Sequence, residues 1–211
     1  MKLPAYFITL EGIEGVGKTT QVTFLSDFLR QCPIPHIITR EPGGTELGEK
    51  LRALLLSDTA LCHDSELLLM FAARAEHLHQ VIQPALARGE WVVCDRFTDA
   101  SYAYQGAGRG IAPERIAQLE QWVQADLRPD LTFLLDAPVT TGLQRVQQRH
   151  HPGQSDRFER EQQLFFEKVR NGYLKSATLS PHRYRVIDAT VSVERVTEQL
   201  LTVIMKLLSE P

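Results

Sequence analysis

The sequence reads Tyr6-Phe7-Ile8-Thr9-Leu10-Glu11-Gly12-Ile13-Glu14-Gly15-Val16-Gly17-Lys18-Thr19 over residues 6–19, and no other stretch constrains the fold as strongly. Its second half has the spacing G-x-x-x-x-G-K-[ST] of a phosphate-binding loop. A β-like run precedes the loop, and Val22, Leu25 and Leu29 follow it at helical spacing. This strand, loop and helix order predicts a nucleoside triphosphate site.

The residue types of the loop suit a polyphosphate. Its glycines let the backbone turn tightly and point successive N–H groups at one anion, and the following helix adds its positive end. Lys18 is expected to reach the β- and γ-phosphates, and the Thr19 hydroxyl to ligate Mg²⁺. The predicted ATP-binding loop residues are Gly12, Ile13, Glu14, Gly15, Val16, Gly17, Lys18 and Thr19.

Five β-like runs are separated by helical patterns, as a mostly parallel sheet requires, at residues 6–10, 36–39, 91–94, 131–135 and 184–187. Acids follow three of the runs, at Glu11, Asp95 and Asp136, so polar groups gather where open α/β sheets bind ligands. Helices are expected over residues 65–87, with a bend or interruption near Pro84, and over residues 113–127.

Length and composition predict one α/β domain over residues 1–211, without repeats or a linker. A net charge of -3 gives no general attraction to nucleic acid. Three cysteines are too few and too scattered for a disulfide framework, and none has zinc-site spacing with a histidine. We find no signal peptide and no apolar run near 18 residues, and therefore expect a cytoplasmic protein without membrane contact.

The sequence also carries a second set of anion-binding side chains. The strings D-x-x-G and [NT]-K-x-D, typical of GTPases, do not occur. Arginines instead lie on separate segments, at Arg40, Arg74, Arg96, Arg145, Arg149 and Arg157. A guanidinium group holds phosphate bidentately. This number of arginines outside the phosphate-binding loop therefore indicates a site for a second phosphate, that of the acceptor.

Several motifs together resemble the bacterial thymidylate kinases, which transfer the γ-phosphoryl group of ATP to dTMP. They are Thr39-Arg40-Glu41-Pro42-Gly43-Gly44-Thr45, Phe71-Ala72-Ala73-Arg74, Asp95-Arg96-Phe97, Ala103-Tyr104-Gln105-Gly106, Arg128-Pro129-Asp130 and Asp156-Arg157-Phe158-Glu159. The resemblance covers most of the chain. It implies a three-layer P-loop kinase fold with a five-stranded parallel sheet in the order 2-3-1-4-5.

The resemblance also implies an acceptor site. Arg96 would clamp the dTMP phosphate, Arg74 and Gln105 would meet the thymine edge, and Tyr104 would pack under the deoxyribose. Glu14 would accept the sugar 3′-hydroxyl. Phe71 is taken as the ring on thymine, although the family alignment also permits Met70. The full implied set is Glu14, Arg40, Glu41, Pro42, Arg52, Phe71, Arg74, Arg96, Ser101, Tyr104 and Gln105.

In this family the catalytic arginine lies either in the phosphate-binding loop or in a lid. No basic residue occupies positions 13–16, so the resemblance implies the lid type, with Arg149 acting in a lid around residues 145–158. Arg145 and Arg157 are the further lid residues toward ATP. The implied catalytic set is Lys18, Arg149, Arg96 and Glu14, and Asp95 would join Thr19 at the metal.

The family's dimers pack long helices, which implies a homodimer through the apolar helical face near residues 67–78. Two alternatives to a dTMP kinase stay open: a kinase for another nucleoside monophosphate, and a P-loop ATP-binding regulator without transfer activity.

Overall fold

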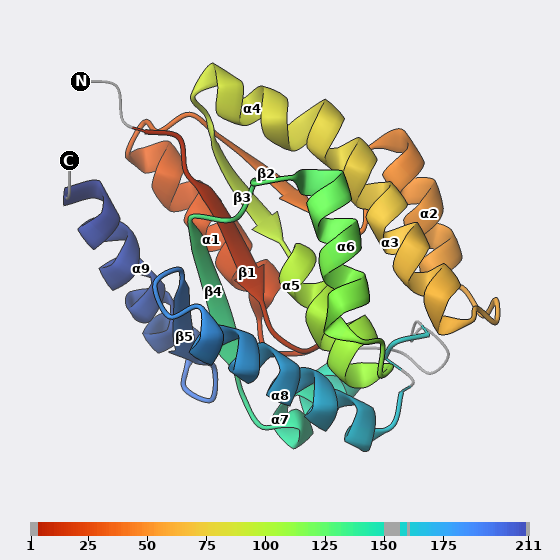
Figure 1. The fold of residues 1–211 in the computed structure, drawn as a ribbon. Helices are drawn as coiled ribbons and strands as arrows, with labels where there is room; N and C mark the ends of the chain where they lie inside the picture. Colours follow the sequence, from red (N-terminus) through yellow and green to blue (C-terminus); the bar gives the residue numbers. More distant parts are fainter. Residues whose placement is uncertain (1–3, 150–156, 160, 210–211) are drawn as a thin grey trace.

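The structure, a computed structural model, describes residues 4–149, 157–159 and 161–209. Its centre is a parallel sheet in the order β2-β3-β1-β4-β5 (Figure 1), which confirms the predicted fold class and strand order. The observed strands agree with the predicted runs to within one residue at each end. They are β1 (Phe7–Glu11), β2 (His36–Arg40), β3 (Trp91–Asp95), β4 (Leu131–Asp136) and β5 (Tyr184–Asp188).

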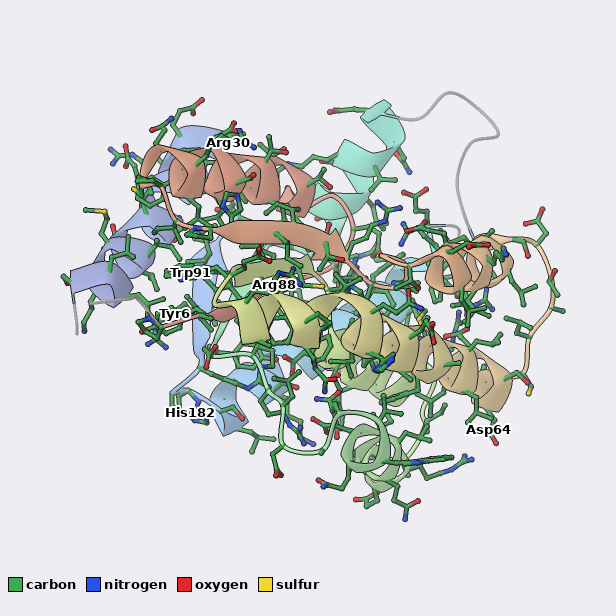
Figure 2. All side chains as sticks on the ribbon, turned by 90° about the horizontal axis from the view of Figure 1, so that it is seen from above. Tyr6, Arg30, Asp64, Arg88, Trp91 and His182 are labelled. Carbon is green, nitrogen blue, oxygen red and sulfur yellow. The ribbon has the colours of Figure 1, made fainter. Side chains whose placement is uncertain are left out.

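Helices cover both faces of this sheet, so α1 lies on one side of the strands and α4 on the other (Figure 2). The helices are α1 (Lys18–Gln31), α2 (Glu46–Leu56), α3 (His63–His77), α4 (Gln83–Arg88), α5 (Thr98–Ser101), α6 (Pro113–Gln124), α7 (Val139–Arg149), α8 (Gln163–Leu179) and α9 (Val193–Ser209). Two π-helical turns, η1 (Leu78–Ile82) and η2 (Tyr102–Gly108), interrupt the helical segments.

The alternation of side chains along the strands explains the two apolar layers. Ile8 and Leu10 of β1 belong to the cluster that contains Leu25 and Leu29 of α1. Phe7, one position away, belongs instead to the cluster on the α4 side. Because successive strand residues point to opposite faces, a strand buried on both faces must be apolar at nearly every position.

The predicted helix over residues 65–87 is three consecutive elements, α3, η1 and α4. The irregular turns lie just before Pro84, which occupies the first turn of α4. Proline cannot donate a backbone hydrogen bond, and its ring crowds the carbonyl four residues earlier, so the preceding turn widens. The apolar face expected on this segment is split: Phe71, Leu78 and Ile82 are buried, whereas Leu68, Ala72 and Ala75 are exposed.

The second π-helical turn, η2, packs closely against α8. Gly172 of α8 permits this approach, because a Cβ atom at that position would lie 2.8 Å from the Cβ of Ala107 and 3.2 Å from the Cα of Ala103. The close packing fixes the segment that carries Tyr104 and Gln105.

The strands place their polar ends together, as expected. Glu11, Arg40, Asp95 and Asp136 are the last residues of β1, β2, β3 and β4. Arg40 and Asp95 are register partners, as are Asp95 and Leu10. All these ends therefore meet at one edge of the sheet, beside the loop that joins β1 to α1.

Candidate functional site

The loop between β1 and α1 has the backbone of an anion cradle. Gly12, Gly15 and Gly17 have φ values of +134°, +76° and +97°, a region that residues with a Cβ atom rarely adopt. A Cβ at Gly15 would also lie 2.1 Å from the carbonyl oxygen of Gly142 on α7. Ile13 and Val16 are buried and anchor the loop in the core. Helix α1 begins at Lys18 without a side-chain cap, so the positive end of its dipole points at the hollow above the loop.

The Lys18 ammonium group lies over this loop. Its Nζ atom donates to the carbonyl oxygens of Gly12, at 3.0 Å, and Ile13, at 2.9 Å. Burial and, to a lesser extent, the positive charge of Arg96 lower the pKa of Lys18 to about 8, although Asp95 and Glu14 oppose the shift. An anion beside Lys18 would favour its protonated form, so the ammonium is poised to gain from a bound polyphosphate.

Arg96 lies between this loop and an apolar cavity that Met70, Arg74 and Tyr104 also line, called the second cavity below. Its φ of +68° turns the chain sharply after β3. Its Nη1 atom donates to the Gly12 carbonyl oxygen at 2.8 Å and to the Tyr173 hydroxyl at 3.0 Å, and its Nη2 atom donates to Glu14 Oε1 at 2.9 Å. The guanidinium is therefore held firmly where the loop and the second cavity meet.

Tyr104 completes this cluster. Its hydroxyl group lies 2.7 Å from both carboxylate oxygens of Glu14, and the Arg96 guanidinium lies 4.8 Å from the centre of its ring. Arg96 and Tyr104 thus fix the Glu14 carboxylate beside the second cavity. This geometry brings together three residues that the sequence assigned to the sugar and phosphate of the acceptor.

Arg74 forms the far end of the second cavity. Its Nε atom donates to Glu41 Oε2 at 2.7 Å, and both Nη atoms donate to the Ser101 hydroxyl at 3.2 Å. Its guanidinium stacks 4.5 Å from the ring centre of Phe71. Glu41 also accepts a hydrogen bond from His77 Nδ1 at 3.0 Å, so it is held on two sides.

Phe71 itself does not line this cavity. Only 2% of its surface is exposed, and it packs with Leu67, Ile111 and Ile116. Met70 lines the cavity instead, so the structure places the alternative residue there. The lining is Glu14, Glu41, Pro42, Arg52, Leu56, Met70, Arg74, Arg96, Phe97, Ala100, Ser101, Tyr104, Gln105 and Phe158.

A polar cavity lies directly over the loop. Its lining is Glu14, Gly15, Gly17, Lys18, Thr19, Thr20, Arg40, Glu41, Arg52, Asp95, Arg96 and Glu159. Arg40 is paired with Glu49 at 2.9 Å, and Arg52 donates to the Pro42 carbonyl oxygen at 2.9 Å. Asp95 Oδ1 is buried and has no hydrogen-bond partner among the described residues. Asp95 and Thr19 thus both line the polar cavity.

A third hollow lies on the other side of the loop. It is lined by Gly15, Val16, Gly17, Thr20, Gln21, Arg145, Gln148, Ala189, Val191, Ser192, Val193 and Val196. The Arg145 Nη1 atom donates to the Ala189 carbonyl oxygen at 3.0 Å, so α7 is tied to the segment between β5 and α9. No sequence motif pointed to this segment, because its contribution to the hollow is largely backbone and small apolar side chains.

The three hollows follow one another without a gap in their linings. Gly15, Gly17 and Thr20 border both the third hollow and the polar cavity. Glu14, Glu41, Arg52 and Arg96 border both the polar cavity and the second, apolar one. The site can therefore hold two molecules end to end, joined at their anionic groups over the loop.

Arg157, a predicted lid residue, does not line any of these hollows. Arg157 donates through Nη2 to Glu66 at 2.7 Å and through Nε to the Leu55 carbonyl oxygen at 3.2 Å, away from the phosphate-binding loop. The backbone of Arg149 ends α7, but its side chain and residues 150–156 lie outside the described residues.

Glu11, which the sequence placed at a strand end without a specific role, is a buried carboxylate beneath the loop. Glu11 Oε1 accepts from the Phe97 backbone N–H at 2.7 Å, and Oε2 accepts from the Tyr173 hydroxyl at 2.8 Å. Burial and, to a lesser extent, the negative charge of Asp99 raise the pKa of Glu11 to about 8, although Arg96 opposes the shift. Tyr173 comes from α8, far along the chain, so only the folded structure shows that it contacts both Glu11 and Arg96.

Comparisons with known proteins agree with this geometry. The family model of thymidylate kinases matches residues 10–200. The chain is 56% identical over 206 residues to a thymidylate kinase of Methylococcus capsulatus, with 98% of each chain covered. It is 58% identical over 196 residues to one of Pseudomonas putida, with 92% of each chain covered.

Solved structures give the same result. A crystal structure of thymidylate kinase from Ehrlichia chaffeensis superposes with a TM-score of 0.78 at 36% identity, covering 95% of this chain and 99% of that one. The matches extend over nearly the whole length and include every hollow of the site. The chain belongs to the thymidylate kinase family.

Proposed function

We propose that this protein transfers the γ-phosphoryl group of ATP to dTMP, giving dTDP and ADP. One observation carries the proposal: the polar cavity over the phosphate-binding loop and the apolar cavity beside it share Glu14, Glu41, Arg52 and Arg96. A triphosphate on the loop and a monophosphate from the apolar cavity would meet at these residues. Phosphoryl transfer depends mainly on such positioning and on neutralising the negative charge of the phosphate oxygens that are brought close together.

On the donor side, the loop N–H groups, the start of α1 and Lys18 hold the β- and γ-phosphates. The hollow lined by Arg145 and residues 189–193 takes the adenosine. Thr19 and Asp95 would hold Mg²⁺, and the orphaned Asp95 Oδ1 fits this role because a carboxylate oxygen is a preferred magnesium ligand. When bound, Mg²⁺ supplies charge neutralisation on the β- and γ-phosphate oxygens.

A substitution at Asp95 tests the metal assignment. Asp95→Asn removes the charge but keeps the shape of the side chain. The Mg²⁺ concentration for half-maximal rate should rise about tenfold, because an anionic ligand becomes a neutral one. An unchanged Mg²⁺ dependence would place the metal elsewhere.

On the acceptor side, Arg96 binds the dTMP phosphate, and Glu14 accepts the 3′-hydroxyl of the sugar. The Tyr104 ring lies beside these groups, under the deoxyribose. Arg74 and Gln105 meet the base edge, and Arg40, Glu41, Pro42, Arg52 and Ser101 support this set from the cavity walls. Met70, Phe97 and Ala100 add the apolar surface that suits the thymine methyl group.

The lid supplies the remaining positive charge. Arg149 is proposed to reach the transferring phosphoryl group, with Arg145 on the same helix, when residues around 145–158 close over ATP. Arg157 would serve ATP only by leaving Glu66, which accepts its hydrogen bond here. Its position in this structure supports a role on the acceptor side.

A coupled ADP-release assay with ATP·Mg²⁺ and a panel of dTMP, dUMP, UMP, dCMP and AMP tests the function. We expect strong preference for dTMP, and Lys18→Met as a control should abolish turnover. Preference for another monophosphate would indicate a different nucleotide kinase. ADP release that needs no acceptor would reject transfer, and binding of ATP without turnover would indicate a regulator.

We also infer one domain over residues 1–211 and a homodimer in a reducing cytoplasm. Exposed apolar side chains on α2 and α3 support the dimer, including Leu68, which is 55% exposed, and Leu47, which is 46% exposed. The three cysteines are free thiols, and none of the described helices is long and apolar enough to cross a membrane. A monomer mass by light scattering at micromolar concentration would reject the dimer.

A further inference from the structure

Glu66 is a fully buried carboxylate that accepts hydrogen bonds from three side chains distant in the sequence, on two separate segments. It lies on α3, and its exposed fraction is 0%. Gln105 Nε2, on η2, donates to its Oε1 at 2.7 Å. Arg157 Nη2, from the C-terminal end of the predicted lid, donates to its Oε2 at 2.7 Å. Arg109 Nε lies 3.4 Å from Oε2.

These contacts leave the carboxylate no freedom to turn. The two guanidinium groups balance its charge, and Arg157 is itself anchored on the Leu55 and Leu56 carbonyl oxygens. Arg109 is held by Glu161 at 2.6 Å and by the ring of Phe165 at 4.5 Å. A charged hydrogen-bond acceptor is therefore fixed at one position beside Gln105.

This acceptor decides which end of the Gln105 amide faces the ligand. An ionised carboxylate can only accept hydrogen bonds, so Gln105 must turn its NH₂ group toward Glu66. The amide oxygen, Oε1, is then the end left for the cavity that Gln105 lines. Within the part of the chain that the structure describes, no donor reaches this oxygen.

We propose that Glu66 is a positioning residue that makes Gln105 a hydrogen-bond acceptor toward the base. Together with the donor Arg74, the cavity then presents one acceptor and one donor to the base edge. Thymine matches this pair with its N3–H donor and O4 acceptor. Cytosine presents the reverse pattern, with N3 as acceptor and an amino group at C4, so the same two residues select against it.

The inference rests on the proposed function, because it assigns the base specificity of that acceptor site. Its test is the substitution Glu66→Gln, which keeps the size of the side chain. A glutamine at position 66 can donate as well as accept, so the Gln105 amide is free to turn over. We expect the ratio of kcat/KM for dTMP to that for dCMP to fall about tenfold, since one buried hydrogen bond to the base is lost or reversed. The kcat/KM for ATP should change less than twofold.

Two further variants separate positioning from general support of the fold. Arg109→Met disturbs the charge balance around Glu66 but leaves the hydrogen bond to Gln105, so the dTMP to dCMP ratio should stay as in the unmodified enzyme. In a Gln105→Ala background, Glu66→Gln should no longer change the ratio, because Glu66 acts only through that amide. Where dCMP turnover is too slow to measure, the inhibition constant of dCMP against dTMP replaces it.

The outcomes distinguish the two proposals. If the unmodified enzyme does not phosphorylate dTMP, the proposed function itself is refuted. An active enzyme whose Glu66→Gln variant keeps the full ratio, or loses it equally with and without Gln105, would overturn the role of Glu66 alone. If Glu66→Gln does not fold, as judged by thermal melting, Glu66→Asp keeps the charge but is one methylene shorter, and the same fall in the ratio is expected.

Discussion

Replacing Arg96 separates recognition of the acceptor phosphate from recognition of the nucleoside. Among the described residues, Arg96 donates through Nη1 to Gly12 and Tyr173 and through Nη2 to Glu14. A guanidinium has five N–H groups, so one on Nε and one on Nη2 are left for a ligand. These two groups lie on one edge of the fork, in the arrangement that binds two phosphate oxygens.

The loss can be worked out from these two bonds. Hydrogen bonds to a charged partner contribute about 1.5–3 kcal/mol each, so removing both with Arg96→Met should cost at least about 3 kcal/mol of binding to dTMP. That free energy corresponds to roughly a 150-fold fall in affinity. Arg96→Lys keeps a point charge without the fork, and we expect a loss of about tenfold.

The assay compares two ligands that differ only in the phosphate. Dissociation constants for dTMP and thymidine are measured by calorimetry, together with kcat/KM for dTMP and the melting temperature of each variant. The affinity for dTMP should fall as calculated, whereas the affinity for thymidine should change less than threefold. Equal losses for both ligands would refute the reasoning, since Arg96 would then act by holding Gly12, Glu14 and Tyr173 in place.

Three further predictions follow from contacts around the site. The pKa of Glu11 is raised from 4.5 to about 8 in the folded state. Between these two pH values the folded protein keeps Glu11 protonated whereas the unfolded chain does not, so the free energy of unfolding should fall as pH rises through this range. The slope should not exceed about 1.4 kcal/mol per pH unit and should disappear in Glu11→Gln; a ligand-free urea titration at several pH values that shows the same slope in the variant would contradict this. Tyr104→Phe keeps the ring but removes the hydroxyl that holds Glu14, so kcat/KM for dTMP should fall about tenfold while the preference for the deoxyribonucleotide over its ribose counterpart persists. A loss of that sugar preference in the phenylalanine variant would show that the hydroxyl group, rather than the ring, excludes the 2′-hydroxyl. Gly172→Val would force a side chain against Ala103 and Ala107 and should destabilise the fold by about 2 kcal/mol, measured by urea denaturation; an unchanged midpoint would mean that α8 moves away from η2 without cost.

The phosphate-binding loop and the strands were predictable because their signals are contiguous. A glycine-rich loop between an apolar run and an amphipathic helix needs no distant partner to be recognised, and runs buried on both faces are apolar throughout. Even the meeting of Glu11, Arg40 and Asp95 follows from parallel strands ending at one edge. The order of the strands came from the family resemblance of several motifs.

The details of the acceptor cavity were less accessible to sequence reasoning. Met70 and Phe71 are neighbours on α3 and point about 100° apart, since a helix has 3.6 residues per turn. Packing of α3 against Ile111 and Ile116 decides that Phe71 is buried, which leaves Met70 at the cavity. The apolar face assigned to this helix divided for the same reason: Phe71 lies in the contact with Ile111 and Ile116, whereas Leu68, one turn earlier on the helix, is 55% exposed.

Local pattern and chain order were enough to predict the α/β class, the triphosphate loop, and the residue types needed to bind a second phosphate. Each of these features depends on residues that are neighbours in the chain. The partners of individual side chains were decided only by the tertiary structure. Glu66 meets Gln105 and Arg157 across 39 and 91 residues, and Tyr173 meets Arg96 across 77. Such contacts depend on how α8, η2 and α3 pack against each other, and hydrogen bonds between separate elements leave no periodic signal in the sequence.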